Sequence, residues 1–195
     1  MRTPTEESRR EAVKKPLGIP GELAGHVVPY IESLLQKNFS LETLTGRRRE
    51  LREFLSFCFD RSITEPSQIT VSLVERFRKY TSEHISSVTG HRRSVVTQIH
   101  LLSTLRDYLR YLVKKGEMLF NPALEVDLPR MEHRLPRNVL TADETEQILM
   151  MPDLTDPLGL RNRAMLEVLY STGVRRAELR GIDIADVSFA GGTIF

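Results

Sequence analysis

One run of apolar residues limits the fold more than any other feature of this sequence. From about His91 to Lys115, apolar side chains recur at three- and four-residue spacing, which predicts a long amphipathic helix. The apolar positions are Val95, Ile99, Leu102, Leu105, Leu109 and Leu112, with Tyr108 and Tyr111 beside them. Gly116 suits the end of this helix, because glycine tolerates a positive φ. Such a helix must bury its apolar face against other elements, so a packed helical domain is expected.

Three further helices are predicted upstream of it. They cover residues 22–38, in which Pro29 indicates a kink or a late start, residues 40–60, and residues 72–84, which open on a capping box from Ser72 to Glu75. Four helices joined by short loops predict a compact bundle over residues 22–116. Residues 1–21 are polar and rich in turn formers, which predicts a flexible tail.

The remaining residues predict a linker and the start of a second region. In residues 117–140 three prolines follow at intervals, and the residue before each proline avoids the helical conformation, which predicts an extended linker and a domain boundary. A capping box from Thr141 to Glu144 then opens a helix, and a second helix is expected over 160–171. Residues 193–195 have the pattern of a β-strand. The chain is thus predicted to be mainly α, with an α+β region over 141–195.

The charges are distributed unevenly between these regions. Lys and Arg number 23 against 17 Asp and Glu through Arg137, a net charge of +6, and 5 against 9 afterwards, a net charge of −4. The basic part is the better candidate for contact with a polyanion, although an ordinary solvated basic surface would have the same composition. The candidate phosphate-contacting residues are Arg47, Arg48, Arg52, Arg92, Arg93, Arg130, Arg134 and Arg137.

Several classes of protein are disfavoured. Cys58 is the only cysteine, which excludes an internal disulfide framework, and its place on an apolar helical face predicts a buried thiol rather than a nucleophile. His91, His100 and His133 lack metal-binding partners at suitable spacing, so no metal site is predicted. The sequence has no apolar stretch long enough to cross a bilayer and no hydrophobic signal core, which predicts a soluble cytoplasmic protein.

The most specific motif lies near the C-terminus, between residues 169 and 179. Gly173 suits the end of a helix, Arg175 follows it at once, and Glu178 lies three residues on, where it can pair with Arg175 or with a backbone donor. A guanidinium held in this way matches two oxygens of a phosphate. The alternative is that Arg175 caps a helix or pairs with Glu178 on a solvated surface.

The series Thr-Gly-x-Arg-x-x-Glu-Leu, followed by residues Gly-Ile-Asp-Ile-Ala-Asp-Val at 181–187, resembles the first arginine motif of the tyrosine recombinases, the phage-integrase and Xer-type family. The resemblance implies that Arg175 contacts the scissile phosphate and that Glu178 supports it. Residues 101–103, 108–112 and 121–123 are similar to the four-helix core-binding (SAM-like) domain of that family. The resemblance therefore implies such a domain, a linker, and the first helices and strand of an α+β catalytic domain.

The family cleaves DNA through attack of a tyrosine on a phosphodiester, without metal or nucleotide, and acts as tetramers on paired sites. Its partners are double-stranded DNA and further recombinase protomers. Its His-x-x-Arg box and C-terminal tyrosine are missing here, since the sequence has no histidine after His133 and no tyrosine after Tyr170. The expectation is a DNA-binding, catalytically inactive N-terminal portion of a recombinase or integrase. The alternatives are a natural truncated DNA-binding regulator and a helical protein-interaction module.

Overall fold

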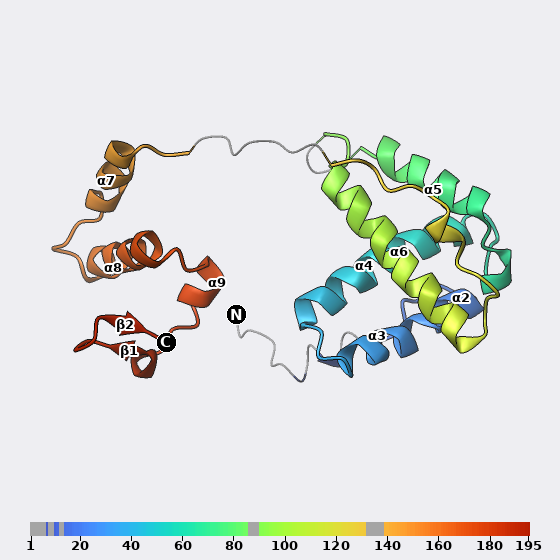
Figure 1. Cartoon of the computed structure of the whole chain (residues 1–195), viewed down its shortest axis with the longest axis horizontal. Coiled ribbons are helices and arrows are strands. Elements are labelled where there is room, and N and C mark those ends of the chain that lie inside the picture. The colour runs from blue at the N-terminus through green and yellow to red at the C-terminus, as the bar shows by residue number, and fades with distance from the viewer. Residues whose placement is uncertain (1–6, 8–9, 12–13, 86–89, 132–138) are drawn as a thin grey trace. The chain divides into compact units, whose positions relative to one another are not determined.

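A computed structural model describes residues 7, 10–11, 14–85, 90–131 and 139–195. The chain forms two compact units, Met1–His133 (unit 1) and Arg134–Phe195 (unit 2). Figure 1 shows that helices dominate both units, as the sequence predicts.

Unit 1 holds five described α-helices and two short 3-10 helices. They are α2 (Glu22–Gly25), α3 (Val27–Leu35), α4 (Leu41–Phe59), η1 (Pro66–Gln68), α5 (Val71–Glu83), α6 (Val95–Lys115) and η2 (Pro122–Leu124). The first predicted helix is divided at His26, which places Pro29 in the first turn of α3, where the missing N–H has no intrahelical partner to lose.

The helix starts follow side-chain caps that differ in part from those predicted. Helix α6 begins at Val95 rather than His91, because Ser94 accepts a hydrogen bond from the Thr97 N–H at 3.2 Å. Helix α5 is capped by Thr70, whose hydroxyl accepts from the Leu73 N–H at 3.2 Å, so the predicted capping box at Ser72 is wrong.

Helix α6 packs against α3, α4 and α5 and supplies much of the core (Figure 1). Its buried positions follow the helical repeat through Gln98, Leu101, Leu102, Leu105, Tyr108, Leu109 and Leu112. Val95, predicted to be in the core, is 37% exposed. Gln98 takes the buried position instead, because its Nε2 donates to the Arg93 carbonyl at 3.0 Å. A pattern based on apolar residues alone does not identify Gln98 as a core residue.

Both ends of unit 1 depart from the predicted tail and linker. Leu17 lies in the core, so the last residues of the predicted tail are packed against the bundle. Ala123 and Val126, in the predicted linker, are also buried. Arg106 holds that segment by donating from Nε to the Ala123 carbonyl at 2.9 Å and from Nη2 to the Val126 carbonyl. The first half of 117–140 therefore belongs to unit 1, and residues 132–138 lie outside the described ranges.

Unit 2 contains three α-helices, one 3-10 helix and a short hairpin in its described part. They are α7 (Ala142–Met150), α8 (Pro157–Thr172), α9 (Arg176–Leu179), η3 (Ile184–Asp186), β1 (Val187–Ser188) and β2 (Thr193–Ile194). The predicted capping box at Thr141 is present, since the Glu144 carboxylate accepts from the Thr141 N–H at 2.8 Å.

The predicted strand at 193–195 is one arm of an antiparallel pair, in which Val187 faces Ile194 and Ser188 faces Thr193. Strand β1 was not predicted. Among the described residues of unit 2 only Gly159 is buried, so this unit has no closed apolar core in the structure. None of the helices in the described ranges combines the length and apolar content that a membrane span requires.

Candidate functional site

The turn between α8 and α9 fixes the direction in which the chain presents Arg175. Gly173 has a φ of 66°, in the left-handed region, and its N–H donates to the Leu169 carbonyl at 3.0 Å. The Thr172 hydroxyl donates to the Val168 carbonyl at 2.6 Å and accepts from the Val174 N–H at 3.2 Å. The turn is thus held on both sides of the glycine.

Glu178 holds Arg175 through two hydrogen bonds, which realise both pairings that the sequence suggests. The Arg175 N–H donates to Oε2 at 2.8 Å, and its Nη1 donates to Oε1 at 3.0 Å. Both bonds lower the pKa of the Glu178 carboxyl below its usual value, and the bond from the backbone N–H has the larger effect. The carboxyl group therefore stays ionised at neutral pH.

The guanidinium of Arg175 is open to a ligand. Its side chain is 84% exposed, and Glu178 is its only recorded partner within the described ranges. Because a guanidinium carries five N–H donors, Nε and Nη2 stay available to a phosphate after Nη1 has bound the carboxylate. The same pair would also serve as a cap on a solvated surface, so the geometry alone leaves both interpretations in place.

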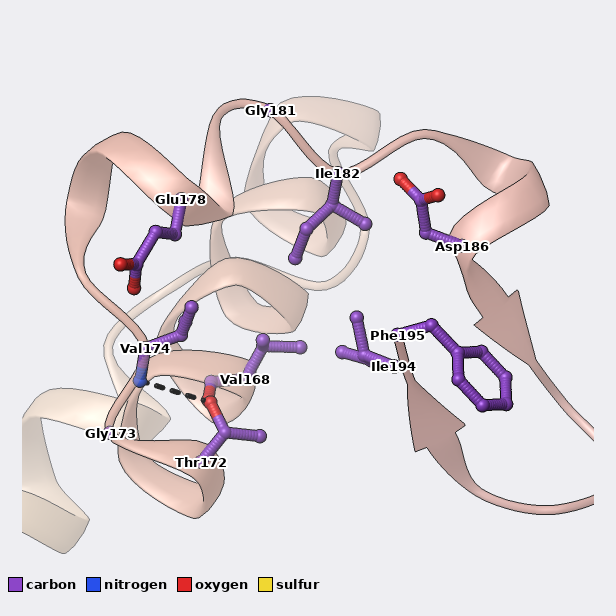
Figure 2. Close-up of a pocket in the computed structure, with 10 residues that line it drawn as sticks. All are labelled: Val168, Thr172, Gly173, Val174, Glu178, Gly181, Ile182, Asp186, Ile194 and Phe195. Atoms are coloured by element: carbon purple, nitrogen blue, oxygen red, sulfur yellow. Dashed lines mark hydrogen bonds between the residues drawn. The ribbon is translucent and has the colours of Figure 1, made fainter. Parts of the chain in front are cut away.

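A hollow of about 510 Å³ adjoins this turn (Figure 2). Figure 2 shows the apolar side chains of Val168, Val174, Ile182 and Ile194 directed into it, with the Glu178 and Asp186 carboxylates near its edge. The hollow is therefore an uncovered apolar face of α8 and the hairpin, and Arg175 does not line it.

Four of the arginines predicted to contact phosphate have partners inside unit 1. Arg47 donates from Nη1 to Asp107 Oδ2 at 2.7 Å and to the Tyr30 hydroxyl at 2.9 Å. Arg93 pairs with Glu53. Arg48 and Arg52 donate to backbone carbonyls of residues 15–17. These contacts give all four a structural role.

The other predicted contacts divide by exposure. Arg92 and Arg130 are exposed, whereas Arg134 and Arg137 lie outside the described residues. Arg49, which is not among the predicted phosphate contacts, is exposed and has no side-chain hydrogen bond or ion pair in the described part of the chain. It lines a hollow of about 420 Å³ together with Arg52, Arg61 and Tyr80. Successive residues of a helix are rotated by about 100° about its axis, so three consecutive arginines on a packed helix cannot all face the protein, and some of them point toward solvent.

The tyrosines also differ in their surroundings. Burial raises the pKa of Tyr108 and of Tyr30, as expected for rings packed in the core. Tyr170, by contrast, is 63% exposed on α8. It precedes Arg175 by five residues.

The sequence is similar to that of several known proteins. The model of the phage integrase family matches residues 138–195. Tyrosine recombinase XerC 2 of Ralstonia nicotianae is 36% identical over 165 residues, which make up 85% of this chain and 47% of that protein. Tyrosine recombinase XerC of Oceanobacillus iheyensis is 33% identical over 175 residues, which make up 89% and 55%.

Tyrosine recombinase XerD of Listeria monocytogenes is 31% identical over 162 residues, 83% of this chain and 52% of that protein. The chain therefore spans about half the length of the curated relatives it matches. A solved structure, the integrase from mycobacterium phage Brujita, aligns with 87% of this chain and 54% of its own at 18% identity and a TM-score of 0.47.

These similarities extend over both units of the chain. The chain belongs to the tyrosine recombinase family, which includes the phage integrases and the Xer recombinases.

Proposed function

We propose that this chain is the DNA-binding portion of a site-specific tyrosine recombinase. In this proposal unit 1 is the core-binding domain, unit 2 is the first part of the catalytic domain, and Arg175 contacts the scissile phosphate. The observation that carries the proposal is the turn at residues 172–175, which presents an exposed guanidinium tied to Glu178. Duplex DNA and further recombinase protomers are the proposed partners, and the cytoplasm is the proposed compartment.

The charge on Arg175 suits the reaction of the family. Attack on a phosphodiester builds additional negative charge on the two non-bridging oxygens. A fixed cation beside these oxygens therefore stabilises the transition state more than the ground state. Because Glu178 already restrains the side chain, little conformational entropy is lost when a phosphate binds. Arg175 is thus suited to bind a phosphate and stabilise its transition state.

Cleavage also requires a nucleophile, and on this proposal the 195-residue chain alone binds DNA without cutting it. Incubation with a suicide DNA substrate is expected to give no covalent adduct. Tyr170 is the exposed tyrosine nearest in sequence to Arg175, so a Tyr170→Phe variant belongs in the same experiment. An adduct formed by the wild-type chain would contradict the inactivity, and its loss in Tyr170→Phe would identify the nucleophile.

The role of Arg175 is tested by comparing Arg175→Ala with Arg176→Ala in binding to a fluorescent duplex. Both residues are exposed and both variants lose one positive charge, so the long-range electrostatic effect is matched. Loss of a charge-assisted hydrogen bond costs about 1.5–3 kcal/mol, so Arg175→Ala should weaken binding about tenfold to a hundredfold more than Arg176→Ala. Equal losses would mean that Arg175 is only a surface cap.

Two alternatives make different predictions. A natural DNA-binding regulator would bind DNA in the same way, and sequencing of the transcript beyond residue 195 separates it from the leading proposal. A helical protein-interaction module would show no binding that weakens steeply with salt, whereas phosphate contact requires such weakening through counterion release.

A further inference from the structure

Three potential metal ligands meet in unit 1. Glu22 is the first residue of α2, His26 lies between α2 and α3, and Glu117 follows the end of α6. One carboxylate oxygen from each glutamate and one ring nitrogen of His26 all lie within 4.8 Å of one another. Glu22 and His26 are four residues apart on one helical face. Glu117 is distant from them in the sequence and is brought beside them by the tertiary structure.

The ring of His26 supplies a second, independent observation. Its Nε2 is closed to solvent and has no hydrogen-bond partner in the described part of the structure. The nearest carboxylate oxygen, Glu22 Oε1, is 3.9 Å away, which is too long for a hydrogen bond. Buried polar atoms are nearly always paired, so this unpaired nitrogen beside the Glu22 carboxylate indicates a bound ligand.

Hydrogen bonds fix the backbone on both sides of this cluster. On α2, the Leu23 N–H donates to the Thr64 carbonyl at 2.8 Å, and the Leu23 carbonyl accepts from the Tyr108 hydroxyl of α6. At the end of α6, the Glu117 N–H donates to the Leu112 carbonyl at 3.0 Å beyond the left-handed Gly116. The three ligands are therefore carried on backbone that is already in place, so a metal would lose little energy in ordering them.

We propose that Glu22, His26 and Glu117 bind a divalent zinc ion that joins helix α2 and its junction with α3 to the end of α6. An imidazole nitrogen with two carboxylates is a zinc-type ligand set, whereas magnesium and calcium take oxygen ligands. Two carboxylates balance the charge of the ion, and water completes a tetrahedral site. The ion acts on the stability of unit 1 and has no part in phosphate chemistry.

The competing explanation is a protonated His26 that pairs with Glu22 alone. That pair would need no metal and no Glu117, so the two explanations differ in their response to added zinc and to the removal of one exposed carboxylate.

The test is thermal unfolding of the 195-residue chain, stripped with EDTA, followed by circular dichroism with and without excess ZnCl2. A ligand that binds only the folded state raises the melting temperature, here by about 5 °C or more at saturating zinc. The rise should be lost in His26→Ala and in Glu117→Gln. His100→Ala, which removes an exposed histidine of α6, is the matched control and should keep the full rise.

Cobalt gives a direct readout of the same site. Co²⁺ added to the wild-type chain should produce the intense visible absorption of a four-coordinate ion, and Glu117→Gln should weaken its binding by about tenfold or more. Glu117 is exposed, so this variant keeps the test valid if His26→Ala unfolds. The absence of a zinc-dependent rise in the wild-type chain, or an equal rise in Glu117→Gln, would overturn the proposal.

Discussion

Arg47 and Arg49 are neighbours on α4, and the structure predicts opposite effects when each is replaced by alanine. The Arg47 side chain is 19% exposed and its Nη1 binds both Asp107 and Tyr30. Arg47→Ala leaves the Asp107 carboxylate, 34% exposed, without this cation and leaves the Tyr30 hydroxyl without its donor. Hydrogen bonds to charged groups contribute about 1.5–3 kcal/mol, and partial exposure of the pair reduces this, so unit 1 should lose about 2 kcal/mol of stability.

Arg49→Ala should instead leave the stability of unit 1 nearly unchanged and alter its binding to DNA. Its side chain is exposed and has no recorded partner among the described residues, so its removal should change the free energy of unfolding by less than about 0.5 kcal/mol. If Arg49 contacts a DNA phosphate, its removal lowers the slope of log K against log salt by about 0.9. Arg47→Ala should leave that slope unchanged, because its charge is already committed within the bundle.

Urea unfolding followed by circular dichroism measures the first quantity, and fluorescence anisotropy of a labelled duplex across a salt series measures the second. The chain has no tryptophan, so intrinsic tryptophan fluorescence is not an option for the unfolding curves. The reasoning is refuted if Arg47→Ala is as stable as the wild-type chain and lowers the salt slope as much as Arg49→Ala does.

Further predictions concern the core, the glycines and the turn. Burial raises the pKa of the Cys58 thiol to about 12, so a thiol reagent at pH 8 should react only as the chain unfolds, and reaction at the rate of a free thiol would contradict its burial. Gly46→Ala within α4 meets no atom within 4 Å and should stabilise unit 1 by about 0.5–1 kcal/mol, as urea unfolding would measure. Gly159→Ala would place its Cβ 1.8 Å from a backbone carbonyl oxygen, so amide exchange should rise in unit 2 and stay constant in unit 1. The pKa of the Glu178 carboxyl is lowered, so its bonds to Arg175 are fully present at a pH above its ordinary pKa of 4.5 and are lost as the pH falls through the lowered pKa. The NMR shift of the Arg175 amide should titrate at that lowered pKa, and Glu178→Gln should remove the titration.

Local patterns predicted the helices well, because an apolar face and a capping side chain lie within a few residues of each other. Thr141 caps α7 where the sequence places it, and Gly116 ends α6 in the left-handed conformation. The turn with Gly173 and Arg175 is likewise a local feature, so its geometry was predictable.

Contacts between distant residues were not predictable from such patterns. Arg47 finds Asp107 sixty positions away, so the sequence shows a cluster of arginines without showing which of them are already paired. Arg106 draws the segment at Ala123 into unit 1, although the prolines around it indicate an extended linker. The sequence also gave no reason to associate Glu117 with His26, because only the packing of α6 beside α2 brings them together.

The central claim is that this chain binds duplex DNA through phosphate contacts, and its salt dependence is the most direct test. Anisotropy of a labelled duplex, titrated with the 195-residue chain from low to physiological ionic strength, should give a linear fall of log K with log salt whose slope corresponds to several phosphates. Micromolar or weaker binding at physiological salt is expected for a duplex of arbitrary sequence. Binding that does not change with salt, or no binding at low salt, would contradict the account.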